Sequence, residues 1–415
     1  MKHFGIISPP VSGHIHPMSA LGRELVSRGH RVTYFQMLDL EDKIRSEGLD
    51  FEPIGERDHP RGSLPVALKR LGQLEGYAAL RFTIAQVART SAMVCRDVPA
   101  AIRRAGVDTL LVDQMEPAGG AVAEHLDIPF VTICNALAIN RDPAVPPAFT
   151  PWRYRDTAFA RARNRLGYLA SDLVTRPITQ VVAEYRRAWR LPALRTPDDS
   201  FSKLAQICQM PKEFDFPRSN LPETFHYVGP LRRDPPKPIP FPWEKLDGRP
   251  LVYASLGTLQ GSREPLFRCF AEACQGLEVQ LVISHGGGLS PEQATRLPGD
   301  PLVVPYAPQL ELLRRASLTI THAGLNTVLD SISCGVPVVA IPITYEQPAI
   351  ARRVEWTGCG QRLSLNGLRG DSLRKAVIRG LRNIRWRDAA RLFQGDAPRV
   401  RGAATAADLA ESGLR

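Results

Sequence analysis

Short runs of apolar residues alternate with longer amphipathic stretches in the first third of the chain. Buried strands are predicted at HFGIIS, at RVTYFQ, at TLLVD (109–113) and at IPFVTIC (128–134), and a helix is predicted from about Pro17 to Arg28. Strands that alternate with helices in this way are typical of a parallel, doubly wound sheet. Residues 64–105 and 143–192 interrupt the alternation and predict two helical inserts.

The same alternation returns in the C-terminal part of the chain. The predicted strands are LVYAS (251–255), VQLVIS (279–284), PLVVP (301–305), SLTIT (317–321) and VPVVAI (336–341). A proline-rich stretch, RRDPPKPIPFPWEKLDG (232–248), separates the two parts and is typical of a stiff linker. Two doubly wound domains that face each other bind ligands in the cleft at the carboxyl ends of their strands. The predicted units are an N-terminal domain (1–232), a linker (233–248), a C-terminal domain (249–390) and a helical segment (391–415) expected to return to the N-terminal domain.

Composition restricts the class of protein. Hydrophobic residues make up 44% and charged residues 23% of the chain, as in soluble globular proteins. No apolar run approaches the ~20 residues that cross a bilayer, and the N-terminus leads into a predicted core strand rather than a secretory signal. The seven cysteines show no CxxC spacing, which is typical of buried thiols in a reducing compartment. We therefore expect a cytoplasmic protein.

The net charge of +11 is distributed unevenly. Residues 153–190 contain nine arginines against Asp156, Asp172 and Glu184, and aromatic residues are interleaved with them. Such a segment is compatible with a peripheral contact at the inner face of a membrane through residues 152–190, and equally with a plain solvated face. No nucleic-acid-binding motif occurs in the chain, so nucleic acid is not expected as a partner.

Polar side chains follow several of the predicted C-terminal strands. Because the carboxyl ends of parallel strands share one edge of a sheet, these side chains are predicted to gather in the cleft. By residue type they suit, in turn, a pyrophosphate, a nucleoside and sugar hydroxyls. They are Ser255, Gly257 and Thr258, then Tyr306 and Gln309, then Glu346 and Gln347.

The stretch THAGLNTVLD (321–330) stands where a predicted strand passes into a predicted helix. A helix N-terminus carries free N–H groups and a partial positive charge, so it attracts anions. Gly324 is expected to let the backbone turn sharply, while His322, Asn326 and Thr327 add donors around the same point. Asp330, further along the helix, can accept hydrogen bonds from sugar hydroxyls. The stretch predicts a site for a phosphorylated sugar or nucleotide, with a simply capped helix as the alternative.

The run from Tyr306 to Gln347 resembles the donor-binding signature of inverting, family 1 (UDP-sugar) glycosyltransferases. That signature begins aromatic-x-P-Q, continues through H-x-G-x-N-[ST]-x-x-[DE] and ends with [DE]-Q, and the chain fits it without gaps. The resemblance covers essentially the whole chain and is closest to the bacterial branch that includes zeaxanthin and other carotenoid glucosyltransferases. It implies a GT-B fold, in which two Rossmann-like domains face each other across a cleft. Tyr306 and Leu325 stand where the plant form has Trp, which leaves both uridine and thymidine open as the base.

The resemblance also implies a role for each matched residue on the donor side. The base is contacted by the ring of Tyr306 and the backbone of Ala307, and the ribose by Gln309 and Asp330. The diphosphate is bound by His322, Asn326, Thr327 and the loop from Ser255 to Thr258. The transferred sugar is held by Glu346 and Gln347.

A second match lies in SGHIHP, where His14 stands at the position of the family's catalytic base and Asp113 at that of its paired carboxylate. An imidazole with a pKa near ~6.5 can take a proton from a hydroxyl at neutral pH, and a carboxylate behind it fixes its tautomer. His16 competes for this role, but the motif places the base directly after the glycine. No D-x-D sequence and no His/Cys cluster with metal spacing occurs, so neither a metal nor another cofactor is expected beside the UDP-sugar.

The leading hypothesis is an enzyme that moves a sugar, glucose in first place, from a UDP-sugar to a lipophilic hydroxyl compound. Such an acceptor is a carotenoid or other terpenoid alcohol, or a phenol or flavonoid. One alternative is a nucleotide-sugar epimerase, against which the H-x-G-x-N run argues. The other is a non-catalytic GT-B protein that acts as a binding or membrane-associated partner, against which the presence of both His14 and Asp113 argues.

Overall fold

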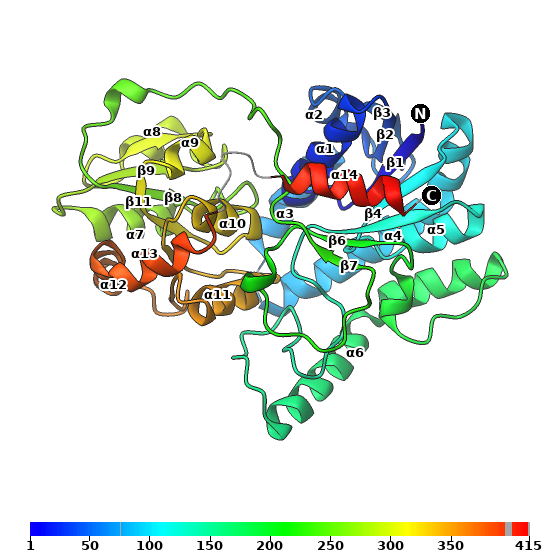
Figure 1. Ribbon diagram of the computed structural model, residues 1–415. Helices are drawn as coiled ribbons and strands as arrows, with labels where there is room; N and C mark the ends of the chain where they lie inside the picture. Colours follow the sequence, from blue (N-terminus) through cyan, green and yellow to red (C-terminus); the bar gives the residue numbers. More distant parts are fainter. Residues whose placement is uncertain (75, 395–400, 414–415) are drawn as a thin grey trace.

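A computed structural model of the chain describes residues 1–74, 76–394 and 401–413. Its strands form two sheets, in which neighbouring strands run parallel. Helices surround both sheets, and the two lobes lie side by side (Figure 1). Two parallel α/β sheets confirm the doubly wound fold class that the strand–helix alternation predicts.

The N-terminal lobe is built on a seven-stranded sheet with the order β3-β2-β1-β4-β5-β6-β7. Its strands are β1 (His3–Ile7), β2 (Arg31–Gln36), β3 (Asp50–Pro53), β4 (Thr109–Asp113), β5 (Phe130–Cys134), β6 (Gln206–Cys208) and β7 (Phe225–Tyr227). Its helices are α1 (Ser12–Ser27), α2 (Glu41–Arg45), α3 (Ser63–Gln73), α4 (Gly76–Ala105), α5 (Gly119–Leu126) and α6 (Ala158–Ala188). Because β1 pairs with β4 in parallel, the helix that follows β1 starts beside the end of β4.

The C-terminal lobe is built on a six-stranded sheet with the order β10-β9-β8-β11-β12-β13. Its strands are β8 (Leu251–Ser255), β9 (Gln280–Ser284), β10 (Leu302–Val304), β11 (Ala316–Thr321), β12 (Val338–Ala340) and β13 (Gly360–Arg362). The helices after β7 are α7 (Glu264–Cys274), α8 (Pro291–Thr295), α9 (Gln309–Leu313), α10 (Leu325–Ser333), α11 (Gln347–Trp356), α12 (Gly370–Arg382), α13 (Ile384–Arg391) and α14 (Gly402–Ser412).

The two lobes are held together by a shared interface as well as by the linker. One apolar cluster combines Cys134 and Leu137 of the first lobe with Leu325 and Ile350 of the second. Beside it, the fully buried Arg353 on α11 donates to Asp215 at 3.0 and 2.7 Å. A charge-assisted pair of this kind fixes the relative position of two surfaces, because either partner left alone would be a buried, unpaired charge.

The last helix, α14, crosses back to the N-terminal lobe and packs on α1 (Figure 1). Arg28 donates to Asp408 at 2.6 Å and to the carbonyl of Ala404 at 2.9 Å, and His30 lies 2.8 Å from Glu411. Of the predicted helical segment 391–415, residues 395–400 and 414–415 lie outside the described residues.

The structure corrects three predictions of secondary structure. The first helix begins at Ser12 and not at Pro17, so His14 and His16 lie on the helix rather than before it. The insert 143–192 is helical only over α6, since residues 135–157 form no helix or strand. Finally, β3, β6, β7 and β13 were not predicted, because these short strands mix polar and apolar residues, unlike the equally short but apolar β10 and β12.

Candidate active site

His14 and Asp113 meet at the start of α1, where the carboxyl ends of β1 and β4 lie next to each other. Nδ1 of His14 lies 2.7 Å from Oδ2 of Asp113, whose side chain is fully buried. Asp113 also accepts a hydrogen bond from Asn135 at 2.7 Å and one from the backbone N–H of Met115 at 2.8 Å. The carboxylate therefore stays in place and accepts a hydrogen bond from Nδ1–H, which leaves Nε2 of His14 as the basic nitrogen.

The pKa of His14 is shifted upward, and this suits a base that must hold a proton during a reaction. Burial lowers this pKa, but the charge of Asp113 and its hydrogen bond, with a smaller effect of Glu346, raise it by more. The competing His16 has no such partner. Burial, Lys43 and Lys237 lower the pKa of His16 to about 4. The carboxylate lies beside His14 and not beside His16.

Pro17, inside α1, links the base to the opposite lobe. Proline has no N–H, so the helix leaves the carbonyl of Gly13, four residues earlier, without its usual partner. Nδ2 of Asn326 donates to this carbonyl at 3.0 Å, and Oδ1 of Asn326 accepts from Gln209 at 3.0 Å. The amide of Asn326, predicted to bind diphosphate, thus bridges the two lobes in this structure. No motif in the sequence pointed to Gln209.

The imidazole ring of His322, at the end of β11, packs closely against Gly257 and Gly324. A Cβ atom on Gly324 would lie 2.6 Å from Nε2 of His322, and a Cβ atom on Gly257 would lie 3.0 Å from its Cε1. The sharp turn expected at Gly324 occurs one residue earlier, at Ala323, where φ is +65°. Gly324 itself has an ordinary φ of −62° as the N-cap of α10. It is glycine because the imidazole ring lies against it, which corrects the role that the sequence indicated.

His322 is uncharged near neutral pH. Burial lowers its pKa to about 4, although a hydrogen bond with the backbone of Ser255 raises it in part. It therefore offers a neutral imidazole to an anion, and the N-terminus of α10 supplies the partial positive charge next to it. Thr327, in the first turn of α10, and Thr258, in the loop after β8, complete this part of the site.

Gln309 and Asp330 contact each other, as two residues expected to hold one ribose should. Nε2 of Gln309 donates to Oδ2 of Asp330 at 2.6 Å. The other carboxylate oxygen accepts from Arg232 at 2.5 Å, and Arg232 also donates to Ser333 at 3.2 Å. Arg232 stands at the beginning of the proline-rich stretch and was not predicted to belong to the site. No local motif could have found it, because its partner lies 98 residues further along the chain.

The other residues predicted to bind the nucleotide base and the diphosphate lie on the loops after β10 and β8. Tyr306 follows β10, is 54% exposed and donates to the carbonyl of Gly286 at 3.3 Å. Ala307 is buried next to it, so its backbone is what a base could contact. Ser255 accepts a hydrogen bond from the backbone N–H of Gly257 at 3.2 Å, which shapes the loop after β8.

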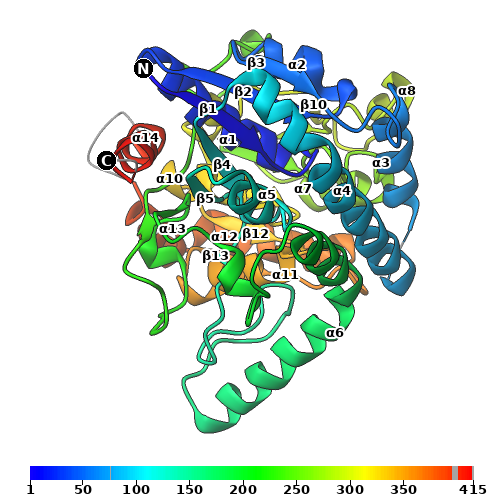
Figure 2. The same ribbon diagram turned by 90° about the vertical axis from the view of Figure 1, so that its right-hand side faces the viewer.

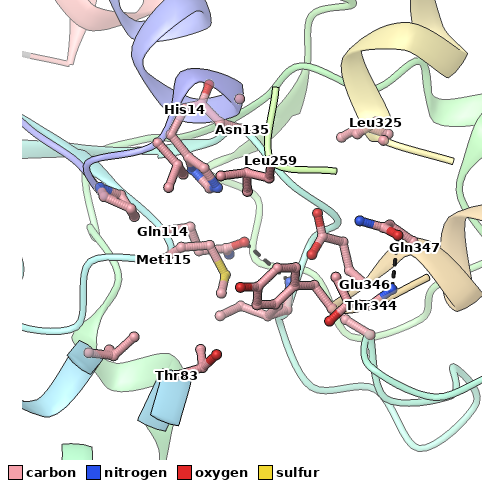
Figure 3. A pocket seen from close by; sticks show the side chains of 18 of the residues that line it. His14, Thr83, Gln114, Met115, Asn135, Leu259, Leu325, Thr344, Glu346 and Gln347 are labelled. Carbon is pink, nitrogen blue, oxygen red and sulfur yellow. Dashed lines mark hydrogen bonds between the residues drawn. The ribbon is translucent and has the colours of Figure 1, made fainter. Parts of the chain in front are cut away.

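Glu346 and Gln347 stand at the start of α11, opposite His14. Oε1 of Gln347 accepts from the backbone N–H groups of Ile343 and Thr344, both at 2.9 Å, which fixes the loop before the helix. Its amide N–H₂ group remains available to a ligand. Burial, with an addition from Asp113, raises the pKa of Glu346. Figure 3 shows that His14 and Glu346 point into one pocket from opposite sides.

One cavity of about 2110 Å³ joins these residues. It contains His14 and all the predicted donor residues, whereas Asp113 lies behind His14. A pocket for one drug-sized ligand has about 300–1,000 Å³, so this cavity has room for two substrates. Its N-terminal side is lined mainly by apolar side chains of α3, α4, α6 and the loop after β5: Leu68, Leu71, Phe82, Val87, Ile139 and Ile178.

Two further properties concern the described residues only. Within residues 1–74, 76–394 and 401–413, no three His, Cys, Asp or Glu side chains are grouped so that they could hold a metal ion. No helix in the same ranges is long and apolar enough to cross a membrane.

The chain is similar to known proteins over most of its length. The chain matches the family described as UDP-glucoronosyl and UDP-glucosyl transferase over residues 69–392, and the N-terminal domain of glycosyltransferase family 28 over residues 12–110. It is 40% identical to the zeaxanthin glucosyltransferase of Pantoea ananas over 367 residues, which are 88% of this chain and 85% of that protein. With the zeaxanthin glucosyltransferase of Pseudescherichia vulneris it shares 38% identity over 368 residues, or 88% and 86% of the two chains.

Among solved structures, the glycotransferase of kitacinnamycin is similar to this chain with a TM-score of 0.76 and 22% identity. The similarity covers 100% of this chain and 99% of that one. At this identity it shows the fold, which is the GT-B arrangement of two facing doubly wound lobes.

Proposed function

Because the chain belongs to the UDP-glucoronosyl and UDP-glucosyl transferase family, we propose that it transfers glucose from UDP-glucose to a hydroxyl group of a carotenoid or related terpenoid alcohol. Glucose and a carotenoid are the substrates in the names of the two zeaxanthin glucosyltransferases that it resembles. The observation that carries the proposal is the cavity itself. It joins a polar, anion-binding wall to an apolar wall, and the His14–Asp113 pair stands between them.

The base step follows from the hydrogen bond between His14 and Asp113. Nε2 of His14 takes the proton of the acceptor hydroxyl while Nδ1–H donates to Asp113, which stabilises the imidazolium as it forms. The hydroxyl oxygen attacks the anomeric carbon of glucose as the bond from this carbon to the diphosphate breaks. The electron pair of that bond leaves with UDP, and the configuration at the anomeric carbon is inverted.

The donor wall positions UDP-glucose for this attack. Tyr306 stacks on the uracil, and Gln309 and Asp330 hold the ribose in the network that Arg232 completes. Glu346 and the free amide N–H₂ of Gln347 hold the glucose hydroxyls opposite His14. Reacting groups that are fixed in this way lose less entropy in the transition state.

The leaving diphosphate gains negative charge during the reaction. The N-terminus of α10, the neutral imidazole of His322 and the hydroxyl of Thr327 are the groups that stabilise it. Asn326 lies at the same helix end, bonded to Gly13 on the helix of the base. This hydrogen bond connects the N-terminus of α10 to the helix that carries His14.

A UDP-release assay tests the proposal. UDP-glucose is supplied with one carotenoid diol, one sterol or one flavonol, and the products are identified by mass. We expect glucosylation of the carotenoid in preference to the flavonol. Transfer to the flavonol alone would replace the carotenoid by a soluble phenolic acceptor. An epimerase would change the sugar nucleotide without releasing UDP, and a non-catalytic protein would bind UDP without turnover.

A further inference from the structure

Helix α6 exposes apolar side chains on its outer face. The exposed fractions are 82% for Phe159, 67% for Leu166, 63% for Leu169 and 70% for Leu173. These four residues, here called the outer stripe, share one side of the helix. The opposite side is buried against the protein through Ala160, Asn164, Gly167, Ile178 and Val182. Figure 2 shows α6 extending outward from the body of the N-terminal lobe. An apolar stripe on a protruding helix indicates an interaction surface.

Positive charge flanks the outer stripe. Arg161, Arg165 and Arg176 are exposed on α6, in the segment 153–190, which has three acidic residues and nine arginines, of which Arg186 is buried and paired with Glu124. Two of these acids are already paired, Asp156 with Arg161 at 2.7 Å and Asp172 with Arg141. The surface around the stripe therefore attracts anions.

The same helix forms one wall of the acceptor side of the cavity. Gly167, Ser171 and Ile178 line the cavity from the inner side of α6. Val174 lies between the inner and the outer side of α6, because it lines the cavity and is also 43% exposed. One helix thickness thus separates the outer stripe from the space into which a lipophilic acceptor fits.

We infer that α6 docks on an anionic lipid bilayer, with the outer stripe among the lipid chains and its arginines at the headgroups. An amphipathic helix with Phe and Leu on one side and arginines beside them has the composition of interfacial membrane helices. A second copy of the chain is the less suitable occupant, because it would bring two sets of arginines together. The inference rests on the proposed function, since docking places the cavity beside acceptors dissolved in the membrane.

Vesicle flotation tests the docking without any substrate. The full-length protein is mixed with vesicles of phosphatidylcholine alone or with 30% phosphatidylserine, at about 0.1 M and about 0.5 M salt. We expect flotation with the anionic vesicles at low salt and release at high salt, because salt screens the arginines. Each basic residue near an anionic surface contributes roughly fivefold in binding, so Arg161→Glu/Arg165→Glu, at two exposed positions outside the cavity lining, should weaken it at least about tenfold.

The apolar contribution is tested by Leu166→Gln/Leu169→Gln/Leu173→Gln, which should weaken flotation by a similar factor. Matched controls carry the same number of changes on other surfaces: Arg103→Glu/Arg382→Glu for charge and Leu204→Gln/Ile384→Gln/Leu392→Gln for exposed apolar side chains. These controls should float like the wild type. Thermal unfolding shows that each variant is folded.

The outcomes separate this inference from the proposed function. Unchanged flotation of both α6 variants, or equal losses in the controls, would overturn the docking on α6. A concentration-dependent dimer that the α6 variants abolish would show that the stripe binds a second copy instead. Glucosylation of a detergent-solubilised carotenoid should be the same for the α6 variants and the wild type. If no acceptor is glucosylated by the wild type, the proposed function fails whatever the flotation shows.

Discussion

The two walls of the cavity are built in different ways. The donor wall consists of the polar side chains that follow the strands of the C-terminal lobe, and the acceptor wall consists of the apolar side chains of the N-terminal lobe. On the donor wall, polar side chains are held by other protein groups: Asp330 by Gln309 and Arg232, and Gln347 by the backbone of residues 343 and 344. On the acceptor wall, apolar side chains of α3, α4 and α6 provide area without a fixed direction. A nucleotide sugar needs hydrogen-bonding groups of the protein at defined points, whereas an apolar molecule needs only an apolar surface of the right shape.

This difference determines how much substrate binding free energy a substitution removes. A polar group on the donor wall acts through a directed hydrogen bond to a charge, and its loss removes that bond entirely. A methyl group on the acceptor wall contributes only a share of the buried area. The largest effect is expected between the two walls, at His14, because in the proposed reaction this residue takes the proton of the acceptor hydroxyl.

His14→Ala should lower kcat by a factor on the order of 10² or more while UDP affinity stays nearly unchanged. The variant removes the nitrogen that accepts the proton but leaves the donor wall intact. Steady-state kinetics and calorimetry with UDP measure the two quantities. His16→Ala is the matched control and should keep most of the activity, since no carboxylate is paired with it. Near-normal turnover in His14→Ala would remove the assignment.

Asp113→Asn should lower kcat by about 10²–10⁴, because the amide can leave the imidazole in the wrong tautomer. It should also move the pH dependence. The base must be unprotonated, so wild-type kcat/KM should rise with pH through a pKa above the ordinary 6.5 of histidine. Without the charge of Asp113, burial dominates and the pKa of His14 falls. The acidic limb of the profile should therefore shift to lower pH, and an unshifted limb would mean that Asp113 does not act on the base.

The sequence could predict which polar side chains gather in the cavity, because these residues follow buried strands of one sheet. The strands β8, β10, β11 and β12 are recognisable as apolar runs, and the predicted polar residues that follow them line the cavity. Contacts between distant segments could not be predicted in this way. Arg232 reaches Asp330, and Asn326 reaches a carbonyl that is free only because Pro17 lies four residues later in α1. The acceptor wall has no motif, since many apolar residues fill the same area equally well.

His322→Ala should weaken UDP binding by about 1.5–3 kcal/mol, the range for a hydrogen bond to a charged group. Gln347→Glu should spare UDP and slow sugar transfer. The new carboxylate can still accept from the backbone of Ile343 and Thr344, but it has no N–H to donate to glucose. Calorimetry with UDP and turnover with UDP-glucose distinguish the two variants. Equal losses of UDP affinity would show that the sugar and phosphate positions are misassigned.

Val87→Ala on α4 tests the acceptor wall and should have the smallest effect. The variant removes two methyl groups from the lining of the cavity, which corresponds to about 0.8–1.6 kcal/mol at about 0.8 kcal/mol for each buried carbon. We therefore expect KM for a lipophilic acceptor to rise about four- to fifteenfold, with no change in UDP affinity. Val181→Ala on α6, outside the cavity lining, is the matched control and should leave KM unchanged. A loss of UDP affinity in Val87→Ala would mean that the two walls do not act separately, because the acceptor wall would then also shape the nucleotide site.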